Sequence, residues 1–66
     1  MLYVVAKLDP KNHAKVRKEG FETEEPAFER ACRLLASREV FARVIEDDNG
    51  NILENDAEIA ERCASK

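Results

Sequence analysis

The sequence predicts a single α+β domain in which a small antiparallel sheet packs against one central helix, with the element order β-β-α-β-β-α. Three observations lead to this prediction. Residues 2–8 and 40–47 are rich in β-branched and aromatic types, a helical apolar stripe lies between them, and an Asn-Gly pair follows the second run. The 66 residues suffice for one domain (1–66), close to the lower size limit for independent folding.

Residues 2–8 predict the first strand, because they are mostly apolar and end at the turn signal Asp9-Pro10. In a strand, Tyr3 and Val5 share one face and their neighbours share the other.

A second strand is predicted over 16–22, after a polar turn at 9–15. Glycine is uncommon inside a strand, so Gly20 indicates a bulge or a bend.

The central helix is predicted to begin after an N-cap at Thr23 and to end near Ser37. Glu24 and Glu25 fall in its first turn, where negative charge suits the helix dipole, and Pro26 is tolerated that early. The apolar residues repeat at helical spacing and form a stripe wide enough to lie on a sheet. This stripe comprises Phe28, Ala31, Cys32 and Leu35, flanked by Ala27 and Leu34.

The third strand is predicted over 40–47, and the Asn-Gly pair at 49–50 predicts a hairpin that returns over 51–54. Two registers remain open. A two-residue loop would place Asp47 opposite Ile52, whereas a three-residue loop with the glycine at a bulge would shift that pairing by one residue.

A short last helix is predicted from a cap at Asn55 or Asp56 to about Ala64. It has a narrow apolar side and barely three turns, so tertiary contacts must hold it. The apolar side comprises Ile59, Ala60 and Cys63.

The two cysteines, Cys32 and Cys63, are too few for a disulfide scaffold, and both lie on apolar stripes. We therefore expect two free, buried thiols in a cytoplasmic protein, with a single Cys32–Cys63 bridge as the alternative. No apolar run approaches the roughly 18 residues of a membrane helix, and the apolar start of the chain is too short for a secretory signal.

Apolar side chains lie on both faces of the first and third predicted strands, but one helix covers only one face of a sheet. The last helix or a second copy of the chain would have to cover the other face. The sequence therefore predicts a homodimer, with Tyr3 and Val5 as candidates for the dimer face.

The chain lacks a constellation typical of catalysis. Its one histidine, His13, and its serines, Ser37 and Ser65, are far apart in the sequence, and no short Cys or His spacing favours a metal. There is also no glycine-rich phosphate loop. We expect no catalytic residue, no metal and no cofactor, and hence a protein that is not an enzyme.

The charge is unevenly distributed along the chain. Eleven basic against fourteen acidic side chains give a net charge of −3. Residues 1–18 hold five basic side chains and one acidic, a net charge of +4, whereas residues 19–66 hold six basic and thirteen acidic, a net charge of −7.

The acidic remainder favours a small protein-binding or regulatory domain that contacts another protein through an acidic surface. The candidate residues are Glu22, Glu24, Glu25, Glu29, Glu46, Asp47 and Asp48.

The basic segment supports an alternative, a nucleic-acid-associated accessory domain. Its candidate phosphate contacts are Lys7, Lys11, Lys15, Arg17 and Lys18. No aromatic residue lies within this segment from Lys11 to Lys18, so base stacking is not supported.

Phe21-Glu22-Thr23 before the helix and Asp48-Asn49-Gly50 at the hairpin complete a layout that resembles small proteins of phages and prophages. The resemblance covers residues 2–54 and is one of architecture. Some proteins with such a layout inhibit nucleoprotein machinery of the host, so the resemblance implies an inhibitor-like role but assigns no residue to it.

Overall fold

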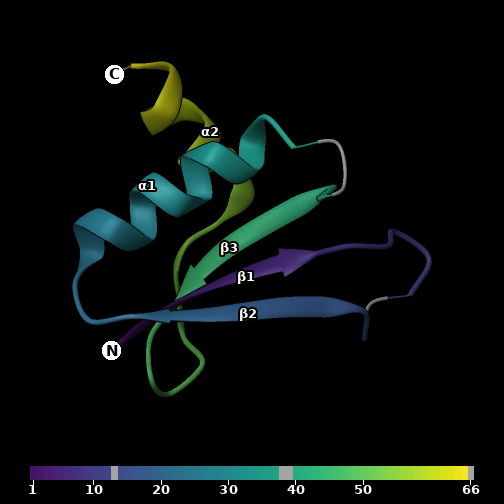
Figure 1. Cartoon of the computed structure of the whole chain (residues 1–66), viewed down its shortest axis with the longest axis horizontal. Helices are drawn as coiled ribbons and strands as arrows, with labels where there is room; N and C mark the ends of the chain where they lie inside the picture. Colours follow the sequence, from purple (N-terminus) through teal and green to yellow (C-terminus); the bar gives the residue numbers. More distant parts are fainter. Residues whose placement is uncertain (13, 38–39, 66) are drawn as a thin grey trace.

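A computed structural model describes residues 1–12, 14–37 and 40–65 of the chain and confirms the α+β fold and the predicted element order (Figure 1). The strands and the central helix are slightly shorter than the sequence predicts, whereas the last helix ends at the predicted residue. The elements are β1 (Leu2–Lys7), β2 (Val16–Phe21), α1 (Glu24–Leu35), β3 (Ala42–Glu46), β4 (Ile52–Glu54) and α2 (Asp56–Ala64).

The four strands form one antiparallel sheet in the order β2-β1-β3-β4, with β1 and β3 at its centre. Val5 in β1 is opposite Lys18 in β2 and Val44 in β3, which places these three side chains on the same face. Figure 1 shows α1 and α2 side by side, with α2 leading to the C-terminus.

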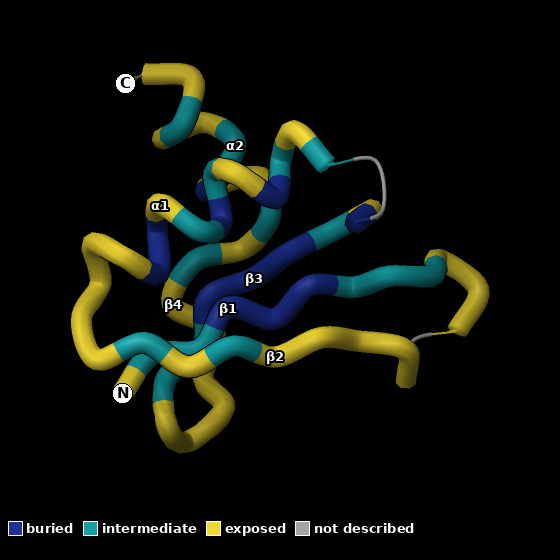
Figure 2. The backbone as a smooth tube through the Cα atoms, in the orientation of Figure 1, coloured by how far each residue is buried: buried dark blue, intermediate teal, exposed yellow. Residues whose placement is uncertain are grey.

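The core lies between the sheet and the two helices. Figure 2 shows the buried stretches along β1 and β3 and on α1, while most of β2 is exposed. The core side chains come from the sheet, from the segment just before β3 and from both helices. They are Val4, Ala6 and Ile45 from the strands, Val40 from the segment before β3, Ala27, Ala31 and Leu34 from α1, and Ile59 from α2. Both helices thus contribute to one core on one face of the sheet, so α2 does not cover the opposite face.

Thr23 occupies the predicted N-cap position of α1 with an extended backbone, but its side chain forms no capping hydrogen bond. The usual partners of a capping side chain are the N–H groups of the second and third helical residues. Pro26 is the third helical residue and has no N–H, which removes one of the two donors.

Gly20 does not create the predicted bulge, because the β1–β2 register runs through it without a shift and places it opposite Tyr3. A Cβ atom at this position would lie 3.3 Å from Cε1 of Tyr3 and 3.4 Å from Cε of Met1. The glycine therefore leaves room for the neighbouring tyrosine ring rather than bending the strand.

The β3–β4 hairpin has the second of the two predicted registers. The Asp47 N–H donates to the Asn51 carbonyl at 3.0 Å, which closes a loop of three residues, and Gly50 has a φ of 82°. Glu46 is consequently opposite Ile52, one residue away from the register of a two-residue loop.

The helix α2 begins with the predicted cap at Asn55, which forms a full capping box with Glu58. The Asn55 side chain accepts from the Glu58 N–H at 2.9 Å, and the Glu58 carboxylate accepts from the Asn55 N–H at 3.2 Å. Ile59 is the fully buried residue of α2, at 0% exposure.

The prediction of free thiols is wrong, because Cys32 and Cys63 form a disulfide that joins α1 to α2. Each cysteine lies on the apolar stripe of its helix, as expected. The stripes of α1 and α2 contact each other in addition to the sheet, which brings the two cysteines together. The Cα atoms are 5.8 Å apart, within the normal range for a bridge. A bridge across a sequence separation of 31 stabilises the domain by about 3–4 kcal/mol, through the lost freedom of the unfolded chain.

The face of the sheet away from the helices is covered by its own long side chains. Val5 and Val44 are only 8% and 9% exposed. The Lys18 ammonium lies 4.7 Å from the centre of the Tyr3 ring and 3.6 Å from the Glu46 carboxylate. These side chains shield the centre of the face within a single chain, so the apolar surplus that predicts a dimer is smaller than the sequence indicates.

Candidate functional site

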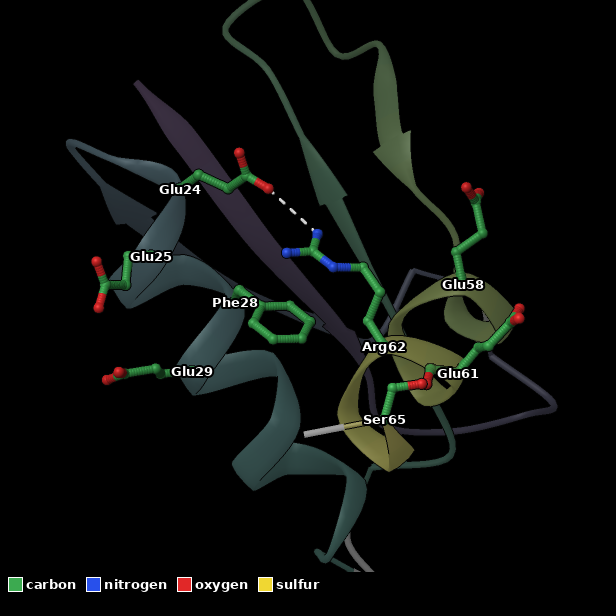
Figure 3. Close-up of a pocket in the computed structure, with 8 residues that line it drawn as sticks. All are labelled: Glu24, Glu25, Phe28, Glu29, Glu58, Glu61, Arg62 and Ser65. Atoms are coloured by element: carbon green, nitrogen blue, oxygen red, sulfur yellow. Dashed lines mark hydrogen bonds and ion pairs between the residues drawn. The ribbon is translucent and has the colours of Figure 1, made fainter.

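A hollow with a volume of about 890 Å³ lies between α1 and α2 on the described surface (Figure 3). We call it the two-helix groove. Four of its described lining residues come from α1, three from α2 and one from the residue after α2. They are Glu24, Glu25, Phe28 and Glu29 from α1, and Glu58, Glu61 and Arg62 from α2 with Ser65 at the cap that follows it.

Helical periodicity explains why these residues line one groove. Residues four apart lie on the same side of a helix, and each helix contributes two pairs with this spacing. The pairs are Glu24 and Phe28, Glu25 and Glu29, Glu58 and Arg62, and Glu61 and Ser65. Their polar side chains flank the apolar contact between the helices, where the Cys32–Cys63 bridge lies. The groove therefore depends on how α2 is placed against α1.

Phe28 and Arg62 form the floor of the groove. Phe28 is 7% exposed, and the Arg62 guanidinium carbon lies 4.0 Å from the centre of its ring. Arg62 Nη1 donates to Glu24 Oε1 at 3.1 Å and also to Glu54 Oε1. Arg62, the one basic side chain among the described lining residues, is thus paired with two carboxylates.

The rims of the groove are acidic. In Figure 3, Glu25 and Glu29 point outward from α1, while Glu58 and Glu61 lie on the far side of α2. In the described part of the chain, Glu25, Glu29 and Glu61 are exposed and their carboxylates form no ion pair. Among the described residues, five carboxylates and one guanidinium line the hollow, and an excess of negative charge attracts basic groups.

The structure divides the predicted acidic surface into separate places. Glu24, Glu25 and Glu29 line the groove, and Glu22 is exposed just before α1, outside the lining. Glu46 lies on the opposite face of the sheet and pairs with Lys18.

The remaining two predicted acids belong to the β3–β4 hairpin. Asp47 stabilises the turn, where its carboxylate accepts hydrogen bonds from the Asn49 N–H at 2.8 Å and the Asn51 N–H at 2.9 Å. Asp48 pairs with the amino terminus at 2.9 Å. Both acids thus have partners within the chain and lie outside the groove.

The sequence reasoning missed the α2 side of the groove, which consists of Glu58, Glu61, Arg62 and Ser65. A signal for it was present. Glu58 and Arg62 are spaced by four residues, as are Glu61 and Ser65, on a helix whose cysteine pairs with one in α1. The spacing becomes informative once α2 is known to lie against α1, as the disulfide and the Arg62–Glu24 pair show.

The predicted basic residues do not form one surface in the described structure. Lys7 and Lys18 face away from the helices, and Arg17, the neighbour of Lys18 in β2, faces the other way. Lys11 and Lys15 are exposed in the β1–β2 turn, and His13 lies outside the described residues. The segment is therefore spread over two faces and a turn.

The described residues contain no group of three His, Cys, Asp or Glu side chains that could hold a metal ion. Ser65 Oγ donates to the Glu61 carbonyl at 3.0 Å, which is a helix-end hydrogen bond. In the same part of the chain, no helix is long and apolar enough to cross a membrane.

The fold and the site together define a small α+β domain with an acidic groove between two disulfide-linked helices. Comparison with protein families, curated proteins and solved structures finds no significant match for this chain. The chemistry of the groove is therefore the basis for a functional proposal.

Proposed function

We propose that this chain is a small, non-catalytic protein-binding domain that holds a basic segment of another protein in the two-helix groove. The observation that supports this proposal most strongly is the set of exposed carboxylates of Glu25, Glu29 and Glu61 beside the floor of Phe28 and Arg62. Complementary charge steers partners together and selects among them.

The shape of the groove also supports a polypeptide partner. Its volume of about 890 Å³ is near the upper end of the range of about 300–1,000 Å³ for small-molecule pockets. It is an open hollow between two helices, with rims formed by two separate elements. An extended or helical segment can lie along such a groove, and its long lysine and arginine side chains can reach over the helices to the carboxylates that point outward from them.

The test is the binding of a lysine-rich peptide at low salt, measured by fluorescence anisotropy. The variant Glu25→Gln/Glu29→Gln/Glu61→Gln removes three charges and keeps the size of each side chain. Exposed ion pairs contribute about 0.2–1 kcal/mol each, so we expect binding to weaken about tenfold. Higher salt should weaken binding to the parent protein as well.

Glu22→Gln is the matched control, because Glu22 is exposed and close in sequence but does not line the groove. It should bind the peptide nearly as the parent does. Equal affinity of the parent and the triple variant, or an equal loss in Glu22→Gln, would contradict the proposal. A glutamate-rich peptide of the same length should not bind.

A further inference from the structure

We propose that the Cys32–Cys63 disulfide is a reversible redox switch that controls the docking of the last turn of α2 and thereby the integrity of the two-helix groove. This inference rests on the proposed function of the groove. It adds that the redox state of the bridge regulates binding in the groove, which does not follow from the charge of the groove.

The position of the bridge relates it directly to the groove. Cys63 lies in the last turn of α2 and follows Arg62, which provides part of the floor. Glu61 and Ser65, both lining residues, are two positions away from Cys63 on either side. The turn that the bridge holds against α1 is therefore the turn that carries most of the α2 side of the groove.

The two ends of α2 are held by different contacts. The first turn is held by the Asn55–Glu58 capping box, by the Asp56 carboxylate 3.0 Å from Arg43 Nε, and by the buried Ile59. None of these contacts involves a cysteine. Reduction of the bridge should therefore leave the first turn docked on the sheet.

The last turn has fewer attachments besides the bridge. Arg62 contacts Phe28 and pairs with Glu24 and Glu54, but its side chain is 45% exposed, and exposed ion pairs stabilise weakly. Cys63 itself packs against the core. Without the covalent link, the last turn should detach readily and take Arg62 with it.

Both cysteine residues are only half-buried, so the bridge lies close to the surface rather than deep in the core. A thiolate of an external dithiol attacks one sulfur, which forms a mixed disulfide and releases the other cysteine as a thiolate that takes up a proton. The second thiol of the reductant, as its thiolate, then displaces the first cysteine, which is protonated in turn. Two electrons pass to the protein, and the reductant leaves as a disulfide.

The test compares the oxidised protein with the protein reduced by dithiothreitol, using two readouts. Hydrogen exchange should accelerate much more in residues 60–65 than in the amides of β1 and β3 on reduction. Affinity for the lysine-rich peptide should fall about tenfold, within the usual range of coupling between two sites. The variant Cys32→Ser/Cys63→Ser should behave like the reduced protein and should not respond to dithiothreitol.

Each other outcome has a defined meaning. Equal exchange in residues 60–65 in the two states would overturn the switch. So would exchange that accelerates as much in the sheet as in residues 60–65, since the bridge would then act only on global unfolding. Equal peptide affinity in the two states would overturn the switch while the proposed function stands. If the oxidised protein binds no peptide, the proposed function fails, and hydrogen exchange alone decides whether the bridge controls α2.

Discussion

The side chain of Asp47 shows how one residue can determine a turn. Its carboxylate accepts hydrogen bonds from the N–H groups of Asn49 and Asn51 and from Asn51 Nδ2 at 3.1 Å. These donors favour the charged form, with the two groups of Asn51 as the main cause, and they hold the pKa of Asp47 below its ordinary value of 3.8. The ionised carboxylate thus stabilises the three-residue loop.

The lowered pKa of Asp47 predicts a particular dependence of stability on pH. The contribution of this carboxylate is complete above its unfolded pKa and is lost as the pH falls through the lower folded value. Asp47→Ala should therefore be less stable than the parent at neutral pH, and the difference should shrink in acid. Urea unfolding at neutral and acidic pH measures this, and a pH-independent difference would contradict the prediction.

Asp47→Asn separates the charge of this residue from its hydrogen bonding. Asparagine keeps one side-chain acceptor for the loop but cannot ionise. Its stability should lie between those of Asp47→Ala and the parent at neutral pH. The gap between Asp47→Asn and the parent should also close as the pH falls.

At the scale of elements, the placement of α2 depends on an ion pair inside the fold. Arg43 in β3 is 5% exposed and faces the helices, and its Nε lies 3.0 Å from Asp56 Oδ1. The same oxygen accepts from the Arg43 backbone N–H at 3.3 Å. The first turn of α2 is thus tied to the main chain and the side chain of β3.

Asp56→Ala should destabilise the domain by about 1–3 kcal/mol, because a buried guanidinium loses its carboxylate partner. This range is below the full cost of breaking a buried pair, since the Asp56 side chain is 43% exposed and water can partly replace it. Asp56→Asn should cost less, because it keeps an acceptor. Thermal unfolding measures both variants, and a cost for Asp56→Ala no larger than that for Asp56→Asn would contradict the role of the pair.

The elements were predictable from the sequence where the deciding forces are local. The stripe of α1, the capping residue Asn55 and the β-rich run before the hairpin each specify their own structure. The disulfide and the groove were not predictable in this way, because both require that α1 and α2 lie side by side on one face. Gly20 was misinterpreted for a related reason, since its role depends on Tyr3 in the neighbouring strand.

At the scale of the whole molecule, the predicted homodimer now has a narrower physical basis. The central valines of the outer sheet face are already covered within one chain. What remains on that face are exposed apolar side chains near its margins. These are Met1 at 55%, Val16 at 42% and Ile52 at 59% exposure.

We expect any dimer through the outer sheet face to be weak, because three marginal side chains provide less apolar contact than a stable interface of about 800 Å² per partner. Sedimentation equilibrium over a range of concentrations should show association that Ile52→Lys reduces, since a charge at an apolar contact is costly to desolvate. Ala64→Lys adds the same charge at an exposed position of α2, away from this face, and should leave association unchanged. A monomeric mass at every concentration would contradict the homodimer and would agree with the coverage of this face by Lys18, Tyr3 and Glu46 within one chain.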